Sequence, residues 1–218
     1  NISAIIDKYD RMRIEILAPN DTKGLDNLRL TNEISKICKR EFERGKINVS
    51  SAGTMLSFME KPNFKMSIGF AQYSAEGNLC GDTIKTINDS RGHMIFIISD
   101  GMGKGSRAAL DGAMGAGLLS KLLSAGFGFD SSLKVVNSAL LVKSHEESLA
   151  TLDCIRVDLF SGKCEFYKAG APKSYVVKEN SLTKCELTSM PAGILRGVEF
   201  AKRTTLLNTC LLYTSPSP

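Results

Sequence analysis

Two aspartates, Asp82 and Asp100, stand at the ends of segments whose composition suits neighbouring β-strands. Asp100 follows the apolar run 94–98, and Asp82 precedes the strand-like segment 83–88. The residues between these segments, 89–92, have the composition of a hairpin turn. Antiparallel strands joined by such a turn bring the start of one beside the end of the next, so we expect both aspartates at the same end of the sheet. Two adjacent carboxylates are costly unless a cation lies between them.

The glycine-rich turn that begins at Asp100 allows three interpretations. The spacing of its glycines departs from the dinucleotide pattern Gly-x-Gly-x-x-Gly, and Lys104 is followed by Gly105 where a Walker loop needs Ser or Thr. A structural interpretation makes Asp100 a helix cap, with the glycines serving only the turn. The third interpretation is a divalent-metal site, with the Asp100 carboxylate and the Gly101 carbonyl as hard oxygen ligands for Mg²⁺ or Mn²⁺. Taken alone, Asp82 suits an ordinary turn, but its pairing with Asp100 favours the metal.

Composition places the chain among globular proteins and argues against several functional classes. Of its 218 residues, 43% are hydrophobic and 23% are charged. The net charge of +5 is too small to indicate a nucleic-acid partner. The six cysteines form no Cys-x-x-Cys pair, which argues against a zinc site and for a reducing compartment. No apolar run is long enough to span a membrane, and we expect a cytoplasmic location.

Hydrophobic periodicity predicts an α+β domain whose helices pack on a sheet without alternating with its strands. The expected helices are 25–42, 103–124 and 130–147. The expected strands are 12–16, 47–58, 64–73, 83–88, 94–98, 151–160, 163–169, 173–178, 182–187 and 199–207. We interpret an interruption at 50–53 as a bulge within the strand 47–58, which pairs with 64–73.

Two details of these elements bear on the site. In the helix 103–124, an apolar stripe of Leu110, Met114, Leu118 and Leu122 accompanies many small residues. Glycines weaken an exposed helix, so their number favours close packing against a sheet or another helix. Asp153 is either a site residue or a satisfied polar group at a strand start, and we favour the structural role.

The motifs resemble a known family. Gly81-Asp82, a strand pair and then Ser99-Asp100-Gly101-Met102-Gly103-Lys104-Gly105 are similar to PPM-type (type 2C) metal-dependent serine/threonine phosphatases. With Ala150-Thr151-Leu152-Asp153 and Lys168-Ala169-Gly170-Ala171-Pro172, the chain more narrowly resembles the phosphatase domain of stage II sporulation protein E. The resemblance covers roughly residues 61–207.

The resemblance implies a PPM-type sandwich of two antiparallel β-sheets flanked by helices, incomplete at the C-terminus, and a phosphatase activity that hydrolyses phosphoserine. It implies two Mn²⁺ or Mg²⁺ ions, with Asp100 bridging them, Gly101 offering its carbonyl, and Asp82 holding a metal directly or through water. Asp82 and Asp100 are thus the expected catalytic residues. The implied substrate is a phosphorylated anti-sigma-factor antagonist, whose dephosphorylation releases a sigma factor during sporulation. The resemblance also suggests a membrane-anchored parent protein.

We expect three segments along the chain. Residues 1–60 form an N-terminal strand and a regulatory or linker helix, residues 61–207 the truncated phosphatase domain, and residues 208–218, which end in Ser-Pro-Ser-Pro, a tail that looks non-native. The alternative function is a catalytically incomplete regulatory module that docks a partner protein, because later metal ligands of the family are missing. A second copy of the chain is also considered as a partner.

Overall fold

The structure, a computed structural model, describes residues 1–19, 26–72, 80–89, 91–103, 105–143, 148–178, 181–207 and 211–214. Lys104 and the predicted end of the helix 130–147 therefore lie outside the described residues. The chain divides into two compact units, Asn1–Asn63 and Phe64–Pro218. Each unit is described by itself below.

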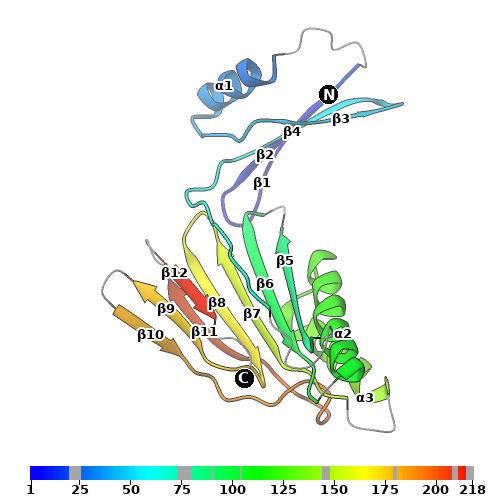
Figure 1. The fold of residues 1–218 in the computed structure, drawn as a ribbon. Coiled ribbons are helices and arrows are strands. Elements are labelled where there is room, and N and C mark those ends of the chain that lie inside the picture. Colours follow the sequence, from blue (N-terminus) through cyan, green and yellow to red (C-terminus); the bar gives the residue numbers. More distant parts are fainter. Residues whose placement is uncertain are drawn as a thin grey trace. The chain divides into compact units, whose positions relative to one another are not determined.

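The first unit is a four-stranded antiparallel sheet packed against one helix (Figure 1). Its elements are β1 (Ile2–Ile6), β2 (Met12–Ala18), α1 (Asn27–Cys38), β3 (Lys46–Ser50) and β4 (Gly53–Met59), with the strand order β1-β2-β4-β3. Asp26 caps α1, because its side chain accepts hydrogen bonds from the backbone N–H groups of Leu28 and Arg29. Lys39, with φ 54°, ends the helix in a left-handed conformation.

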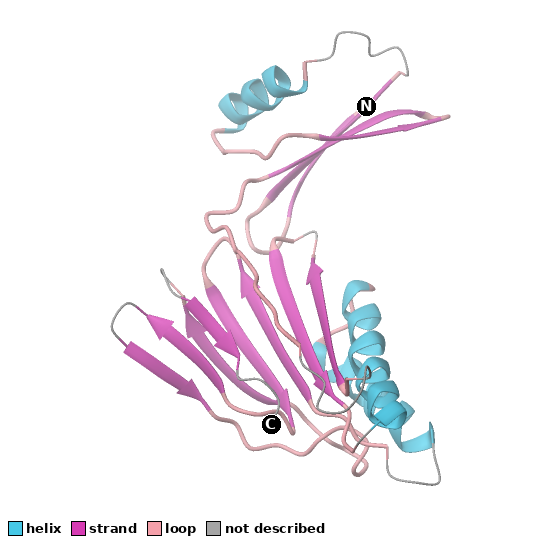
Figure 2. Ribbon diagram, viewed as in Figure 1, coloured by secondary structure: helices cyan, strands magenta, loops and turns pink. Residues whose placement is uncertain are grey.

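The second unit contains two antiparallel sheets and two helices (Figures 1 and 2). The larger sheet has the order β11-β8-β7-β6-β5, and the smaller has the order β10-β9-β12. The strands are β5 (Asp82–Asn88), β6 (His93–Asp100), β7 (Leu152–Asp158), β8 (Lys163–Ala169), β9 (Ser174–Lys178), β10 (Ser181–Cys185), β11 (Ala201–Leu206) and β12 (Leu211–Thr214). The helices are α2 (Gly105–Ser124) and α3 (Phe129–Lys143).

Two apolar layers hold the second unit together, one on each face of the five-stranded sheet. On one face, Ile95 and Ile97 of β6 pack with Leu119 of α2 and Leu133 of α3. On the other face, the side chains of Ile155, Val157 and Phe166 meet Val176 and Cys185 of the smaller sheet. The predicted α+β sandwich of two antiparallel sheets flanked by helices is therefore confirmed.

The helix α2 buries its small residues more fully than the predicted apolar stripe, of which Met114, Leu118 and Leu122 pack partly buried against the core. Ala108, Gly112, Gly115 and Ala116 are buried, whereas Leu110 is 56% exposed. The face without large side chains lets the helix backbone approach the end of the β5–β6 hairpin. Close approach at this place therefore requires small residues in the first half of α2.

Three local predictions differ from the structure. The interruption at 50–53 is not a bulge but the turn of a hairpin between β3 and β4, where Gly53 has a φ of +138°. Residues 64–72 form no strand, because β4 is already paired on both edges by β2 and β3. The strand β1 was not expected, since its residues are exposed and show no regular alternation.

Candidate metal centre

Asp82 and Asp100 lie directly opposite each other on neighbouring strands. In the antiparallel register of β5 and β6, Asp82 pairs with Asp100, and the ladder continues with Thr83 opposite Ser99. Opposed residues of an antiparallel pair project to the same face with Cβ atoms about 5 Å apart. The hairpin turn at 89–92 thus delivers both carboxyl groups to one end of the sheet.

Mutual repulsion and burial act on this pair. Burial, together with the negative charge of Asp100 and a hydrogen bond to it, raises the pKa of Asp82 above its ordinary value of 3.8. Gln72 supports the strand start by donating its Nε2–H to the Asp82 carbonyl oxygen over 2.6 Å. The fold therefore holds two acidic side chains next to each other, and a cation between them would relieve the repulsion of their charges.

The turn after Asp100 is packed backbone to backbone against Gly81 and α2. The Gly101 N–H donates to the Gly81 carbonyl oxygen over 3.2 Å. A Cβ added at Gly101 would overlap the carbonyl oxygen of Ala108 and lie 2.7 Å from the Gly112 nitrogen. A Cβ added at Gly112 would in turn overlap the Gly81 carbonyl oxygen. Only glycine fits at positions 101 and 112, so the backbone after Asp100 packs directly against α2 and Gly81.

Two oxygen atoms lie close to Gly81, on the side where any other residue would carry its Cβ. A Cβ at this residue would lie 3.2 Å from Asp100 Oδ1 and 3.2 Å from the Gly101 carbonyl oxygen. Carboxylate and carbonyl oxygens are the ligands that Mg²⁺ and Mn²⁺ prefer. The donor set of Asp82, Asp100 and Gly101 therefore fits a divalent cation. Among the described residues, no group of three or more His, Cys, Asp or Glu side chains is placed to hold an ion.

The other interpretations of the turn fit less well. Asp100 is the last residue of β6, and α2 begins only at Gly105. Asp100 therefore lies too far before the helix to be its N-cap. The opposed Asp82 also makes the turn unsuitable for a pyrophosphate, since it adds a second negative charge.

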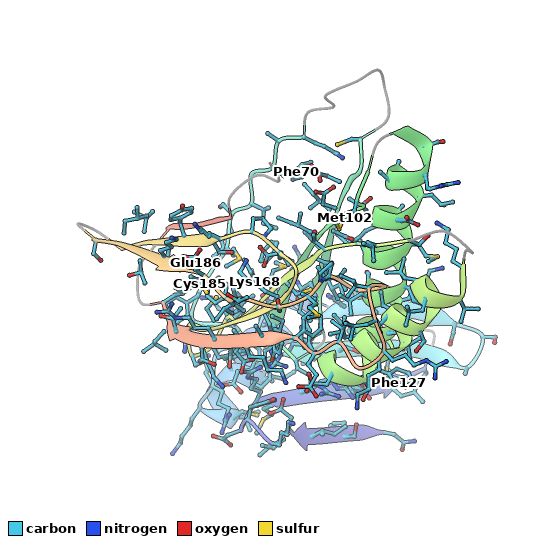
Figure 3. The ribbon with its side chains drawn as sticks, turned by 90° about the horizontal axis from the view of Figure 1, so that it is seen from below. Phe70, Met102, Phe127, Lys168, Cys185 and Glu186 are labelled. Carbon is cyan, nitrogen blue, oxygen red and sulfur yellow. The ribbon has the colours of Figure 1, made fainter. Side chains whose placement is uncertain are left out.

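A buried ion pair lies near the start of β7, on the face toward the smaller sheet. Lys168 is fully buried and donates from Nζ to Asp153 Oδ2 over 2.6 Å, to the Pro172 carbonyl oxygen over 2.6 Å and to Ser174 Oγ over 2.7 Å. Burial raises the pKa of Asp153, and the charge of Lys168 opposes that shift only in part. Figure 3 shows Lys168 beside Cys185 of the smaller sheet. The pair joins β7 and β8 to β9, which agrees with a structural role for Asp153.

A second buried pair connects the two helices. Asp111 of α2 is 1% exposed and forms an ion pair with Lys143 at the end of α3. Asp111 immediately precedes Gly112, which packs against Gly81. The pair therefore ties the position of α2 to α3 next to the turn.

Sequence reasoning did not assign a role to Lys168 or Asp111, although one of them carried a signal. In β8, Cys164 and Phe166 point to the buried face between the sheets, and strict alternation places Lys168 on the same face. A lysine at an inward position indicates a buried acidic partner. Asp111 carried no comparable signal, since it lies outside the apolar stripe that we expected on α2.

Solved structures show which fold this chain shares. The PP2C phosphatase domain of the cell-fate determinant SpoIIE from Bacillus subtilis, solved with a fragment of its regulatory domain, matches with a TM-score of 0.67 at 22% identity. The match covers 95% of this chain and 62% of that one. The serine/threonine phosphatase Stp1 from Staphylococcus aureus matches with a TM-score of 0.55 at 13% identity, over 65% of this chain and 71% of that one. The second unit thus has the fold of PP2C-type phosphatases.

Sequence comparison narrows the assignment to one family. The family described as Stage II sporulation protein E (SpoIIE) matches residues 90–214, and the chain belongs to this family. Stage II sporulation protein E of Bacillus subtilis (strain 168) is 29% identical over 141 residues, which are 64% of this chain and 17% of that protein. The protein of the same name from Priestia megaterium is 30% identical over 123 residues, 56% of this chain and 21% of that protein. The chain thus spans about a fifth of the length of these relatives.

The family match reaches into the segment 208–218. It runs to residue 214, and β12 lies within this segment, whose assignment as a non-native tail stays a prediction. No helix among the described residues combines the length and apolar character needed to cross a membrane.

Proposed function

We propose that this chain carries part of a metal-dependent protein serine phosphatase site. The observation that carries the proposal is the opposed pair Asp82 and Asp100, with Asp100 Oδ1 and the Gly101 carbonyl oxygen on the same side of Gly81. Membership of the family and the PP2C-type fold support it. Asp82 and Asp100 would hold Mn²⁺ or Mg²⁺ through their carboxylate oxygens, and the Gly101 carbonyl oxygen would complete the protein ligands of this site.

Each of these residues has a separate task in phosphoester hydrolysis. Divalent ions in such sites activate a water as the nucleophile and neutralise charge on the phosphoryl oxygens. Asp82 and Asp100 supply the negative charge that binds them at the rim of the sheet. Gly81 has no side chain that would crowd Asp100 Oδ1 and the Gly101 carbonyl oxygen. Because the carboxylates are fixed by strand pairing, little reorganisation accompanies the reaction.

The substrate that we propose is a serine-phosphorylated anti-sigma-factor antagonist. Its dephosphorylation would control the release of a sigma factor during sporulation. Membership of the Stage II sporulation protein E family supports this proposal.

A phosphate-release assay of the 218-residue chain tests the proposal. With Mn²⁺ and either p-nitrophenyl phosphate or the phosphorylated antagonist, the wild-type chain should release phosphate. Asp100→Asn should lower the rate by at least about 100-fold, because it removes a proposed metal ligand. Asp130→Asn, an exposed substitution with the same charge change, is the matched control.

The alternative is a non-catalytic module that docks a partner. A wild-type chain that releases no phosphate at any Mn²⁺ concentration would contradict the phosphatase proposal and favour this module. Activity that survives equally in Asp100→Asn and Asp130→Asn would contradict the assigned site.

A further inference from the structure

Thr151 holds the backbone of Asp100 from both sides. The Asp100 N–H donates to the side-chain Oγ1 of Thr151 over 3.1 Å. The Thr151 N–H donates to the Asp100 carbonyl oxygen over 2.8 Å. One threonine therefore satisfies both backbone polar groups of this proposed metal ligand.

The use of a side chain here departs from the regular ladder. The β6–β7 pairing ends with Ile98 opposite Asp153, and the next hydrogen-bonded position would place Asp100 opposite Thr151. In a regular ladder the Asp100 N–H would bond to the backbone carbonyl of its partner. The Thr151 hydroxyl takes that position instead. A residue without a side-chain acceptor at position 151 would leave the Asp100 N–H without this bond.

Three hydrogen bonds together fix the direction of the Asp100 side chain. Thr151 holds the peptide group before the Asp100 Cα through the N–H, and the one after it through the carbonyl. The latter peptide also carries the Gly101 N–H, which donates to Gly81. With both flanking peptide planes fixed, the Cα–Cβ bond of Asp100 has one direction, and the carboxylate oxygen Oδ1 lies beside Gly81. The orientation of the neighbouring Gly101 carbonyl follows from the same backbone.

Thr151 is itself held between two rigid points. The preceding residue, Ala150, is fully buried and exchanges backbone hydrogen bonds of 3.0 and 2.9 Å with Ala192. Two residues further along, Asp153 is anchored by the buried Lys168, which also reaches the smaller sheet. The hydroxyl of Thr151 thus has a defined position relative to the sheet.

We propose that Thr151 is a positioning residue of the metal centre, resting on the function proposed above. It touches neither substrate nor ion but sets the geometry of the Asp100 carboxylate and the Gly101 carbonyl through the backbone. Residues that orient metal ligands commonly change metal affinity or activity by about 10- to 100-fold when they are replaced.

Two substitutions separate the hydroxyl from the shape of the side chain. Thr151→Val keeps the branched shape and removes the acceptor, whereas Thr151→Ser keeps the acceptor and removes the methyl group. Thr86→Val, at an exposed position of β5, is the matched control for the same change on the same sheet. All variants are made in the complete 218-residue chain.

Amide hydrogen exchange of the metal-free chain is the first readout. We expect the Asp100 amide to exchange about fivefold faster in Thr151→Val than in the wild type, since one hydrogen bond is lost. Thr151→Ser and Thr86→Val should exchange like the wild type at this amide. Equal exchange in all four proteins would contradict the hydrogen bond from the Asp100 N–H to the Thr151 hydroxyl. An equal acceleration in Thr151→Val and Thr151→Ser would contradict it as well.

Mn²⁺ affinity, measured by isothermal titration calorimetry, is the second readout. Thr151→Val should bind Mn²⁺ about tenfold more weakly, and Thr151→Ser within about twofold of the wild type. Unchanged affinity in Thr151→Val would overturn the positioning role. A wild-type chain that binds no Mn²⁺ would also overturn that role, together with the metal centre itself. Mn²⁺ binding that depends on the Thr151 hydroxyl, in a chain without phosphatase activity, would support the positioning role and contradict only the proposed reaction.

Discussion

Gly112 of α2 lies so close to Gly81 that a Cβ on Gly112 would overlap the Gly81 carbonyl oxygen. The same carbonyl accepts a hydrogen bond from Gly101, the residue that turns the chain after Asp100. Helix, turn and strand start therefore meet at one backbone contact. The position of α2 is in this way part of the geometry of the carboxylate pair.

Replacing Gly112 with alanine should destabilise the chain and weaken Mn²⁺ binding. We expect a loss of about 1–3 kcal/mol in the free energy of unfolding, because the added methyl group forces the helix away from the turn. Gly117→Ala on the same helix has open space around its Cβ and should stabilise by up to about 1 kcal/mol. Urea denaturation of the two variants checks this, and equal effects would show that close approach is unimportant.

Removing Lys168 should cost far more than removing the pair. Lys168→Met leaves the buried Asp153 carboxylate without its cation, and we expect a destabilisation of about 3–5 kcal/mol. The double variant Lys168→Met with Asp153→Leu should recover a large part of this loss, since no buried charge remains. A double-mutant cycle by urea denaturation measures the coupling. Additive effects of the two single substitutions would refute the importance of the pair.

The hairpin turn should make stability depend on pH through Asp89. Burial opposes ionisation of Asp89, but hydrogen bonds from His93 and its charge outweigh burial, so the pKa lies below the ordinary value of 3.8. A carboxyl group with a lowered pKa in the folded state contributes stability above its unfolded pKa and loses it as the pH falls through the folded value. Stability should therefore decline between about pH 5 and pH 3, and less steeply in Asp89→Asn.

Thermal unfolding of both proteins across this pH range checks the sign of the effect. Asp130→Asn controls for the loss of one negative charge. A slope for Asp89→Asn that equals the wild-type slope would contradict the role assigned to Asp89.

The sequence predicted the carboxylate pair because a short turn determines the register of its two strands. Once residues 89–92 form a tight hairpin, the position of Asp82 opposite Asp100 follows from counting residues. The family motifs at Asp100 and Asp153 and the layering of helices on a sheet were likewise available from local pattern. The roles of Asp82, Asp100 and Gly101 as ligands remain predictions.

Other features depended on contacts between distant segments. A Ser-Ser-Ala-Gly segment suits either a bulge or a hairpin, and only the pairing of β4 with β2 and β3 shows that it is a hairpin. The alternating segment 64–72 has the pattern of a strand but no partner edge on β4. Thr151 is an ordinary residue for the start of a strand. Its contact with Asp100 joins residues 51 positions apart, so only the folded structure shows it.

The most direct test of the metal centre is an anomalous-scattering map from crystals of the chain grown with MnCl₂. We predict a Mn²⁺ peak near Gly81, coordinated by the carboxylates of Asp82 and Asp100 and by the Gly101 carbonyl oxygen. The peak should disappear in the double variant Asp82→Asn with Asp100→Asn. Saturating Mn²⁺ with no peak between the two carboxylates, or a peak that persists in the double variant, would contradict the account.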